Sequence, residues 1–76
     1  MKLLSNIKKR SVSLQNHKTS ISLEKEFWIE LKNASTTLGL SQNQLISKID
    51  RQRHIGVCGL SSAVRIWILN WIKNQK

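Results

Sequence analysis

The sequence contains no proline, three glycines and a single cysteine, Cys58. The lack of proline and the scarcity of glycine argue against a long linker or a low-complexity segment. One cysteine excludes an internal disulfide framework and leaves no cysteine pair of the zinc-binding type. No stretch reaches the roughly 18 apolar residues of a membrane span, and residues 1–6 hold only two consecutive leucines, too few for a signal peptide. We therefore expect a cytoplasmic protein without membrane segments.

Acidic residues are also scarce. There are 4 Asp and Glu against 13 Lys and Arg, which gives a formal net charge of +9. Residues 1–18 contain no acid at all, and residues 1–9 are predicted to form a basic N-terminal arm. Such arms commonly meet phosphates, although a solvated tail that aids solubility is the alternative interpretation. The residues of this region expected to contact phosphate are Lys8, Lys9 and Arg10.

With 76 residues, the chain is long enough for one small domain, which we place at residues 10–74. A domain of that size buries only roughly 60–65% of its unfolded surface and is marginally stable alone. Stability must therefore come from good packing or from a partner chain.

Two short runs alternate between apolar and polar residues, as half-buried strands do. In residues 10–14, Val12 and Leu14 share one face, and Arg10 is counted with the polar residues. In residues 18–23, the apolar face is Thr19, Ile21 and Leu23 and the polar face is Lys18, Ser20 and Ser22. The three polar residues between the runs suit a hairpin. Alternatively, only the second run is a strand and the first is an ordered arm.

Three helices are expected to follow, at residues 24–38, 41–51 and 62–74. Gly39 is placed to adopt the left-handed conformation that ends the first helix, and Ser41 to cap the second. Ser61 or Ser62 is expected to cap the third. Helical periodicity predicts the residues that face the core. In the first helix they are Phe27, Trp28, Leu31, Ser35 and Leu38, and in the second they are Leu45, Ile46 and Ile49. In the third they are Val64, Trp67, Ile68, Trp71 and Ile72.

This order of elements resembles the ribbon-helix-helix DNA-binding domains, the fold of the Met and Arc repressors. The resemblance is carried by Lys18-Thr19-Ser20-Ile21-Ser22-Leu23, Phe27-Trp28, Leu31, Leu38-Gly39-Leu40-Ser41 and Leu45-Ile46. It covers residues 18–50 best and is similar to a bacterial subgroup with an extra N-terminal strand and a C-terminal helix. The expected fold is mainly α with a short β ribbon and a third, C-terminal helix.

The resemblance implies an intertwined homodimer that binds double-stranded DNA as a transcriptional regulator in the bacterial cytoplasm, associated with the nucleoid. In such domains two chains pair their strands antiparallel, and the resulting two-stranded ribbon enters the major groove, where its outer side chains reach base edges. The implied base-reading residues are Lys18, Ser20 and Ser22, and the helix N-terminus implied to meet a phosphate is Ser41, Gln42 and Asn43. The expected dimer core is Ile21, Leu23, Phe27, Leu31, Leu45, Ile46, Trp67 and Trp71.

Several of these features have plainer interpretations. Ser20 and Ser22 also suit the solvated face of an edge strand, and Ser41 caps its helix whether or not DNA binds. Arg51, Arg53 and His54 suit either phosphate contact or a solvated connection.

The sequence offers little for catalysis or metal binding. His54 and Cys58 lie four residues apart, but two further ligands are lacking nearby, so we expect no zinc site. We find no Gly-rich phosphate loop, paired catalytic carboxylates or nucleophile–base set. We therefore expect neither an enzyme nor a cofactor.

The pairing of residues 10–14 bears directly on function. If this run pairs with residues 18–23 in the same chain, a strand-paired dimer carries a four-stranded sheet, which is too broad for a groove about 12 Å wide. The fold would then suit an antitoxin-like interaction module whose sheet and third helix bind a protein partner. Surface binding to an anionic membrane is the least favoured alternative, because the last helix lacks a strongly charged opposite face.

Overall fold

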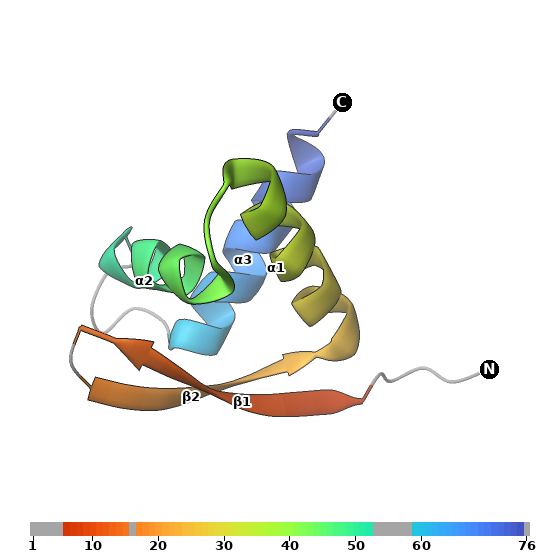
Figure 1. Cartoon of the computed structure of the whole chain (residues 1–76). Helices are drawn as coiled ribbons and strands as arrows, with labels where there is room; N and C mark the ends of the chain where they lie inside the picture. Colours follow the sequence, from red (N-terminus) through yellow and green to blue (C-terminus); the bar gives the residue numbers. More distant parts are fainter. Residues whose placement is uncertain (1–5, 16, 53–58, 76) are drawn as a thin grey trace.

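The computed structural model describes residues 6–15, 17–52 and 59–75. Two strands come first and three helices follow: β1 is Ile7–Leu14, β2 is His17–Glu24, α1 is Lys25–Leu38, α2 is Gln42–Gln52 and α3 is Leu60–Lys73. The two strands form a twisted ribbon on one side of the molecule, and the three helices pack together on the other side (Figure 1). The fold is therefore the expected one, a short β ribbon with helices and a third, C-terminal helix.

The two strands form an antiparallel hairpin within one chain, paired from Ile7 with Glu24 to Leu14 with His17. The first run is thus a true strand and not an ordered arm. It begins at Ile7, three residues before the predicted start, so Lys8 and Lys9 belong to the ribbon.

Residues directly opposite each other in an antiparallel pair lie on the same face of the sheet. Val12 lies opposite Thr19 and Arg10 lies opposite Ile21, so all four belong to the inner face, toward the helices. The expectation that Arg10 lies with the polar residues was wrong, because the strict alternation of a strand places residue 10 with residues 12 and 14. The reason that a charged side chain can lie there is its contact with Trp28, described below.

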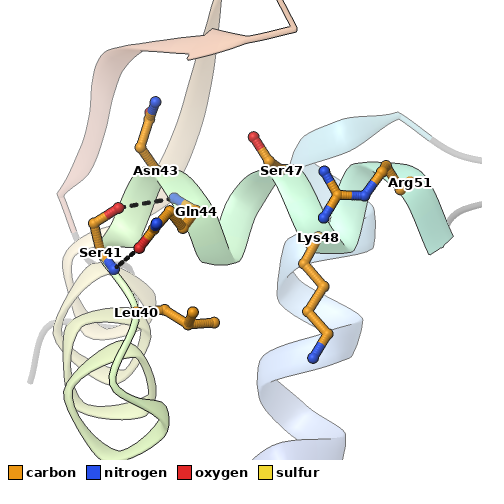
Figure 2. Close-up of a pocket in the computed structure, with 7 residues that line it drawn as sticks. All are labelled: Leu40, Ser41, Asn43, Gln44, Ser47, Lys48 and Arg51. Atoms are coloured by element: carbon orange, nitrogen blue, oxygen red, sulfur yellow. Dashed lines mark hydrogen bonds between the residues drawn. The ribbon is translucent and has the colours of Figure 1, made fainter.

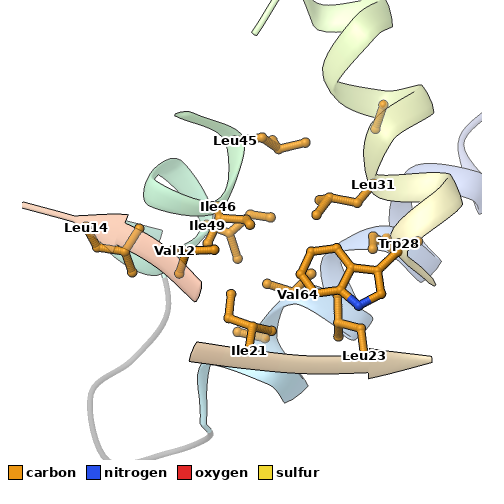
Figure 3. Packing of buried hydrophobic residues seen from close by; sticks show 13 residues of the cluster. Val12, Leu14, Ile21, Leu23, Trp28, Leu31, Leu45, Ile46, Ile49 and Val64 are labelled. Atoms are coloured by element: carbon orange, nitrogen blue, oxygen red, sulfur yellow. The ribbon is translucent and has the colours of Figure 1, made fainter. Parts of the chain in front are cut away.

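The core lies between the ribbon and the helices. Leu14 from β1, Ile21 and Leu23 from β2, Leu31 from α1 and Leu45 from α2 point toward one another in Figure 3. The buried apolar residues of the cluster are Val12, Leu14, Ile21, Leu23, Trp28, Leu31, Ala34, Leu45, Ile46, Ile49, Ala63, Val64 and Ile68.

The predicted dimer core divides into two groups. Five of its members are already buried within one chain, namely Ile21, Leu23, Leu31, Leu45 and Ile46. The hairpin and α3 supply the cover that we expected from a partner. Phe27, Trp67 and Trp71 are only partly buried, and the rings of Trp67 and Trp71 stack with their centroids 5.6 Å apart.

Helix α1 ends as predicted, at Gly39, which has φ +72°. The N–H of Leu40 donates to the carbonyl of Ser35 at 2.9 Å, which closes the last turn. Ala34 is buried although it was missing from the predicted stripe, and Leu38 is 42% exposed although it was included. Leu38 lies at the end of α1 that is farthest from the ribbon, beyond the reach of the core (Figure 1).

The other two helices differ in how well the sequence anticipated them. Helix α2 is capped by Ser41 and buries Leu45, Ile46 and Ile49, as expected. Helix α3 begins at Leu60 with Gly59 as its N-cap, two residues before the predicted start, and without a side-chain cap from a serine. Within the described ranges, no helix combines the length and the apolar character needed to span a bilayer.

Candidate nucleic-acid interface

The face of the ribbon that turns away from the helices is the first candidate surface. Its cross-strand pairs are Lys9 with Ser22, Ser11 with Ser20, and Ser13 with Lys18. We call these six residues the outer face. None of the three described helices covers this side of the ribbon (Figure 1). Two lysines and four serines are therefore presented on a two-stranded surface.

Lys18 and Ser20 are exposed on the outer face where the sequence predicted them, whereas Ser22 is half-buried. The hairpin brings Lys9, Ser11 and Ser13 beside them, and sequence reasoning had not included these in the base-reading set. The sequence placed Lys9 in the basic N-terminal arm and predicted a phosphate contact for it. The alternation of residues 11–14, continued two residues back along the strand, was the signal that could have placed it here.

Helix α3 covers part of the free edge of β2. The N–H of Ser22 donates to Ser61 Oγ at 3.3 Å, and Arg65 Nη2 donates to the Ser22 carbonyl at 3.3 Å. Because alternate residues of an antiparallel strand direct both backbone groups to the same edge, those of Ser20 and Lys18 point to this edge as well. The edge is thus covered at Ser22 and open at Ser20 and Lys18 among the described residues.

Arg65 also pairs with the last residue of β2. Its Nε lies 2.8 Å from Glu24 Oε1, and its Nη2 lies 3.3 Å from Glu24 Oε2. The hydrogen bond from Arg65 lowers the pKa of the Glu24 carboxyl below its ordinary value, because it favours the ionised form. The pair fixes the ribbon to α3 and neutralises one of the few acids of the chain.

Asn43, at the start of α2, covers the edge of β1. Its Nδ2 donates to the Ser13 carbonyl at 2.8 Å, and its Oδ1 accepts from the Ser13 N–H at 3.3 Å. The amide side chain thus bonds to β1 as one residue of a further strand would. The predicted phosphate contact at Asn43 can therefore come from its backbone N–H, while its side chain is engaged with β1.

The first turn of α2 carries the predicted anion site. Ser41 Oγ accepts from the Gln44 N–H at 3.0 Å, and Gln44 Oε1 accepts from the Ser41 N–H at 2.8 Å, which is a reciprocal cap (Figure 2). The N–H groups of Gln42 and Asn43 have no intrahelical partner at this position, and none elsewhere in the described part of the chain. They are the donors that a phosphate could use.

A pocket of about 630 Å³ runs along α2 from this cap. Lys48 extends away from α2 and Arg51 lies near its C-terminal end (Figure 2), and both line the same pocket as Ser41. The described residues that line it are Leu40, Ser41, Asn43, Gln44, Ser47, Lys48 and Arg51. Sequence reasoning considered Arg51 but missed Lys48, although the spacing of residues 41, 44, 48 and 51 places them on one side of a helix.

Lys8 and Arg10 lie at the other end of β1, beside α1. The guanidinium of Arg10 stacks over the indole of Trp28, 4.7 Å from the ring centroid. The indole Nε1 donates to the Lys8 carbonyl at 2.9 Å. The predicted phosphate-binding residues are therefore divided, with Lys9 on the outer face and with Lys8 and Arg10 on the inner side of the ribbon.

Other candidates cannot be placed or are not brought together. Arg53, His54 and Cys58 lie outside the described residues. Within the described ranges, no group of three or more His, Cys, Asp or Glu side chains comes close enough to hold a metal ion.

Comparison with known proteins gives a family and no individual relative. No curated protein and no solved structure matches the chain. A family model described as a ribbon-helix-helix domain matches residues 7–72, which is most of the chain and includes both strands and nearly all of α3. The chain belongs to the ribbon-helix-helix domain family.

Proposed function

We propose that the protein is a dimeric DNA-binding regulator of transcription, active in the bacterial cytoplasm at the nucleoid, which inserts its β ribbon into the major groove. The observation that carries this proposal is the outer face, which presents lysines and hydroxyl groups on the side of the ribbon that none of the described helices covers. Members of the family are generally DNA-binding regulators or antitoxins.

The dimensions of the hairpin suit this role. Two paired strands lie roughly 5 Å apart, and the major groove, about 12 Å wide, admits a two-stranded ribbon. Because both strands belong to one chain, a single copy supplies a complete ribbon. Lys9 and Lys18 can donate to guanine, and the serines suit several bases, so the lysines carry most of the discrimination.

Charge supports contact with the DNA backbone. The chain carries a formal charge of +9. The free N–H groups of Gln42 and Asn43, together with Lys48 and Arg51 along α2, provide donors and cations for phosphate. Binding through such contacts releases counterions, so affinity must fall steeply as salt concentration rises.

The test is a selection from random duplex DNA, with the parent protein and with Lys18→Ala and Ser20→Ala. Each variant should keep thermal stability within about 0.5 kcal/mol, as for ordinary surface changes, and should relax the selected sequence, since a good base contact discriminates by roughly 1–3 kcal/mol. Lys73→Ala, which removes an exposed charge from the end of α3, is the control and should select the parental sequence. A parent that selects no sequence would overturn the base-reading proposal.

Two free surfaces of the chain could form the homodimer. One is the open edge of β2 at Lys18 and Ser20, but pairing there would give a four-stranded sheet that is too broad for the major groove. The other is an apolar stripe on α3, formed by Ile66, Leu69 and Ile72, which are 55%, 54% and 45% exposed. Apolar side chains spaced by three residues lie side by side on a helix and suit burial against another chain.

The same α3 stripe supports a second function, an antitoxin-like module that binds another protein without reading DNA. The two functions differ in their dependence on salt. A chain that binds DNA weakly, with little salt dependence and no sequence preference, would favour the interaction module.

A further inference from the structure

We propose that the pocket between β1 and α1 is a second phosphate-binding site, which holds the DNA backbone beside the inserted ribbon. This inference rests on the proposed function and adds a site to it. The pocket has a volume of about 280 Å³. It is lined by four cations, one indole, one amide and one aliphatic side chain: Lys8, Arg10, Lys25, Lys32, Trp28, Gln42 and Ile29.

The charge of this pocket has no internal counterpart. The described residues of its lining include no acid. None of its four cations belongs to an ion pair among the residues that the structure describes. Like charges gathered around one hollow repel one another, and a bound anion relieves that repulsion. The site is therefore built to gain from an anionic ligand.

Helix α1 keeps its acids away from the pocket. Lys25, Ile29 and Lys32 are spaced by four and three residues and so share one side of the helix. At about 100° per residue, Glu26 and Glu30 lie on a different side, and neither lines the pocket. The charged residues on the pocket side of α1 are thus all cationic.

Arg10 is held in place before any ligand arrives. Its guanidinium stacks on the indole of Trp28, which is only 5% exposed and is anchored through its Nε1 to the Lys8 carbonyl at 2.9 Å. A planar guanidinium fixed in this way has lost much of its freedom and can present paired N–H donors to a phosphate. Lys25 and Lys32 are exposed and can close on the same anion.

The location favours the backbone of DNA over other anions. Gln42 lines this pocket, while its neighbours Ser41 and Asn43 line the pocket along α2, so the two sites lie on either side of the first turn of α2. Both adjoin β1, which carries Lys9, Ser11 and Ser13 on the outer face. A strand of phosphates that borders the groove can therefore contact the two sites in succession.

The experiment compares Lys25→Gln and Lys32→Gln with Lys73→Gln, a matched loss of one exposed helical charge outside both pockets. The measurement is affinity for duplex DNA at several salt concentrations. Each lost phosphate contact should reduce the slope of log K against log salt by about 0.9. We expect that reduction for Lys25→Gln and Lys32→Gln, with an unchanged selected sequence, and the parental slope for Lys73→Gln.

The outcomes separate this inference from the proposed function. If the parent binds and selects DNA but Lys25→Gln and Lys32→Gln keep its slope, the pocket is not a phosphate site and ribbon reading still stands. If the parent shows no salt-dependent binding to DNA, the proposed function fails and the pocket proposal fails with it.

Two further ligands test the identity of the anion. Inorganic phosphate should shift the NMR signal of the Trp28 indole N–H only at concentrations well above those at which DNA does so, because a single phosphate lacks the neighbouring contacts. An oligoglutamate peptide that binds more tightly than DNA, and loses affinity in Lys32→Gln, would overturn the DNA assignment in favour of an acidic protein partner.

Discussion

The side chain of Asn43 bonds to both backbone groups of Ser13, thirty residues earlier in the chain. Through this contact the first turn of α2 is attached to the free edge of β1. A short amide side chain thus covers an edge that could otherwise pair with another strand. The same contact sets the distance between the outer face and the anion site of α2, which the proposed DNA complex requires to be fixed.

Asn43→Ala should destabilise the protein. The change removes two hydrogen bonds at an exposed position, and a typical hydrogen bond contributes about 0.5–1.5 kcal/mol to stability. Part of this loss is offset because alanine has a higher helix propensity than asparagine. We expect a net loss of roughly 1 kcal/mol in a chemical denaturation experiment. Asn33→Ala, at an exposed position of α1, gains the same propensity and loses no contact of this kind. Equal stabilities of the two variants would show that the contact with Ser13 contributes nothing.

The Glu24–Arg65 pair predicts a pH dependence of stability. Arg65 lowers the pKa of Glu24 in the folded protein below the value of the unfolded chain, which is near 4.5. The pair therefore stabilises the fold fully above the unfolded pKa of Glu24, and this stabilisation is lost as pH falls through the folded pKa of Glu24. Glu24→Gln keeps the shape and removes the charge. The parent should be more stable than Glu24→Gln at pH 7, and the difference should shrink below about pH 4.5. A difference that stays constant from pH 7 to pH 3 would contradict the assignment.

Gly39 and Gly59 form a matched pair for testing the end of α1. Gly39 has φ +72°, and a Cβ added there would meet nothing within 4 Å. Gly39→Ala should therefore cost about 1 kcal/mol from backbone conformation alone, and Gly39→Asn less, since asparagine tolerates this region. Gly59 has φ −72° and equal space, so Gly59→Ala should stay within about 0.5 kcal/mol of the parent. Thermal melts of the three variants check the order.

The elements that the sequence predicted well are those governed by local rules. Gly39 was recognisable because a left-handed residue is needed to end a helix, and the Ser41 cap because serine is a preferred residue at a helix N-cap. The inward residues of α2 follow from helical periodicity. Each of these features depends on residues within one or two turns, so a single sequence contains the necessary information.

The features that the sequence did not predict depend on distant residues. The alternation of β1 places Arg10 on the inner face, but the aromatic surface that accommodates its guanidinium comes from Trp28, eighteen residues later. Ser61 does not cap its own helix, because its hydroxyl accepts from Ser22 on β2. The cationic pocket likewise joins β1 to α1 and the start of α2. No periodicity or spacing within one segment reports such contacts.

The assembly of the dimer decides whether ribbon insertion is possible. Pairing two chains through β2 would create four strands, whose three spacings of roughly 4.8 Å span about 14 Å, more than the groove width of about 12 Å. Pairing through α3 leaves each ribbon two-stranded. The backbone N–H and carbonyl of Ser22 are already bonded to Ser61 and Arg65, so the β2 edge is open only at Ser20 and Lys18 among the described residues. Ribbon insertion therefore requires the dimer to form through the apolar stripe of Ile66, Leu69 and Ile72.

Leu69→Glu should accordingly convert the dimer to a folded monomer in sedimentation experiments at micromolar concentration, because it places a charge in the centre of the apolar stripe. Asn70→Glu, which adds the same charge at the next exposed position of α3, should leave two chains together. Ser20→Pro removes an N–H that points to the open edge of β2 and so blocks pairing through that edge. Because the proposed dimer forms through α3, this variant should still be a dimer. The reverse pattern, with Ser20→Pro monomeric and Leu69→Glu dimeric, would mean that the sheet is four-stranded and too broad to enter the groove. A parent protein that sediments as a stable monomer would exclude both modes of pairing.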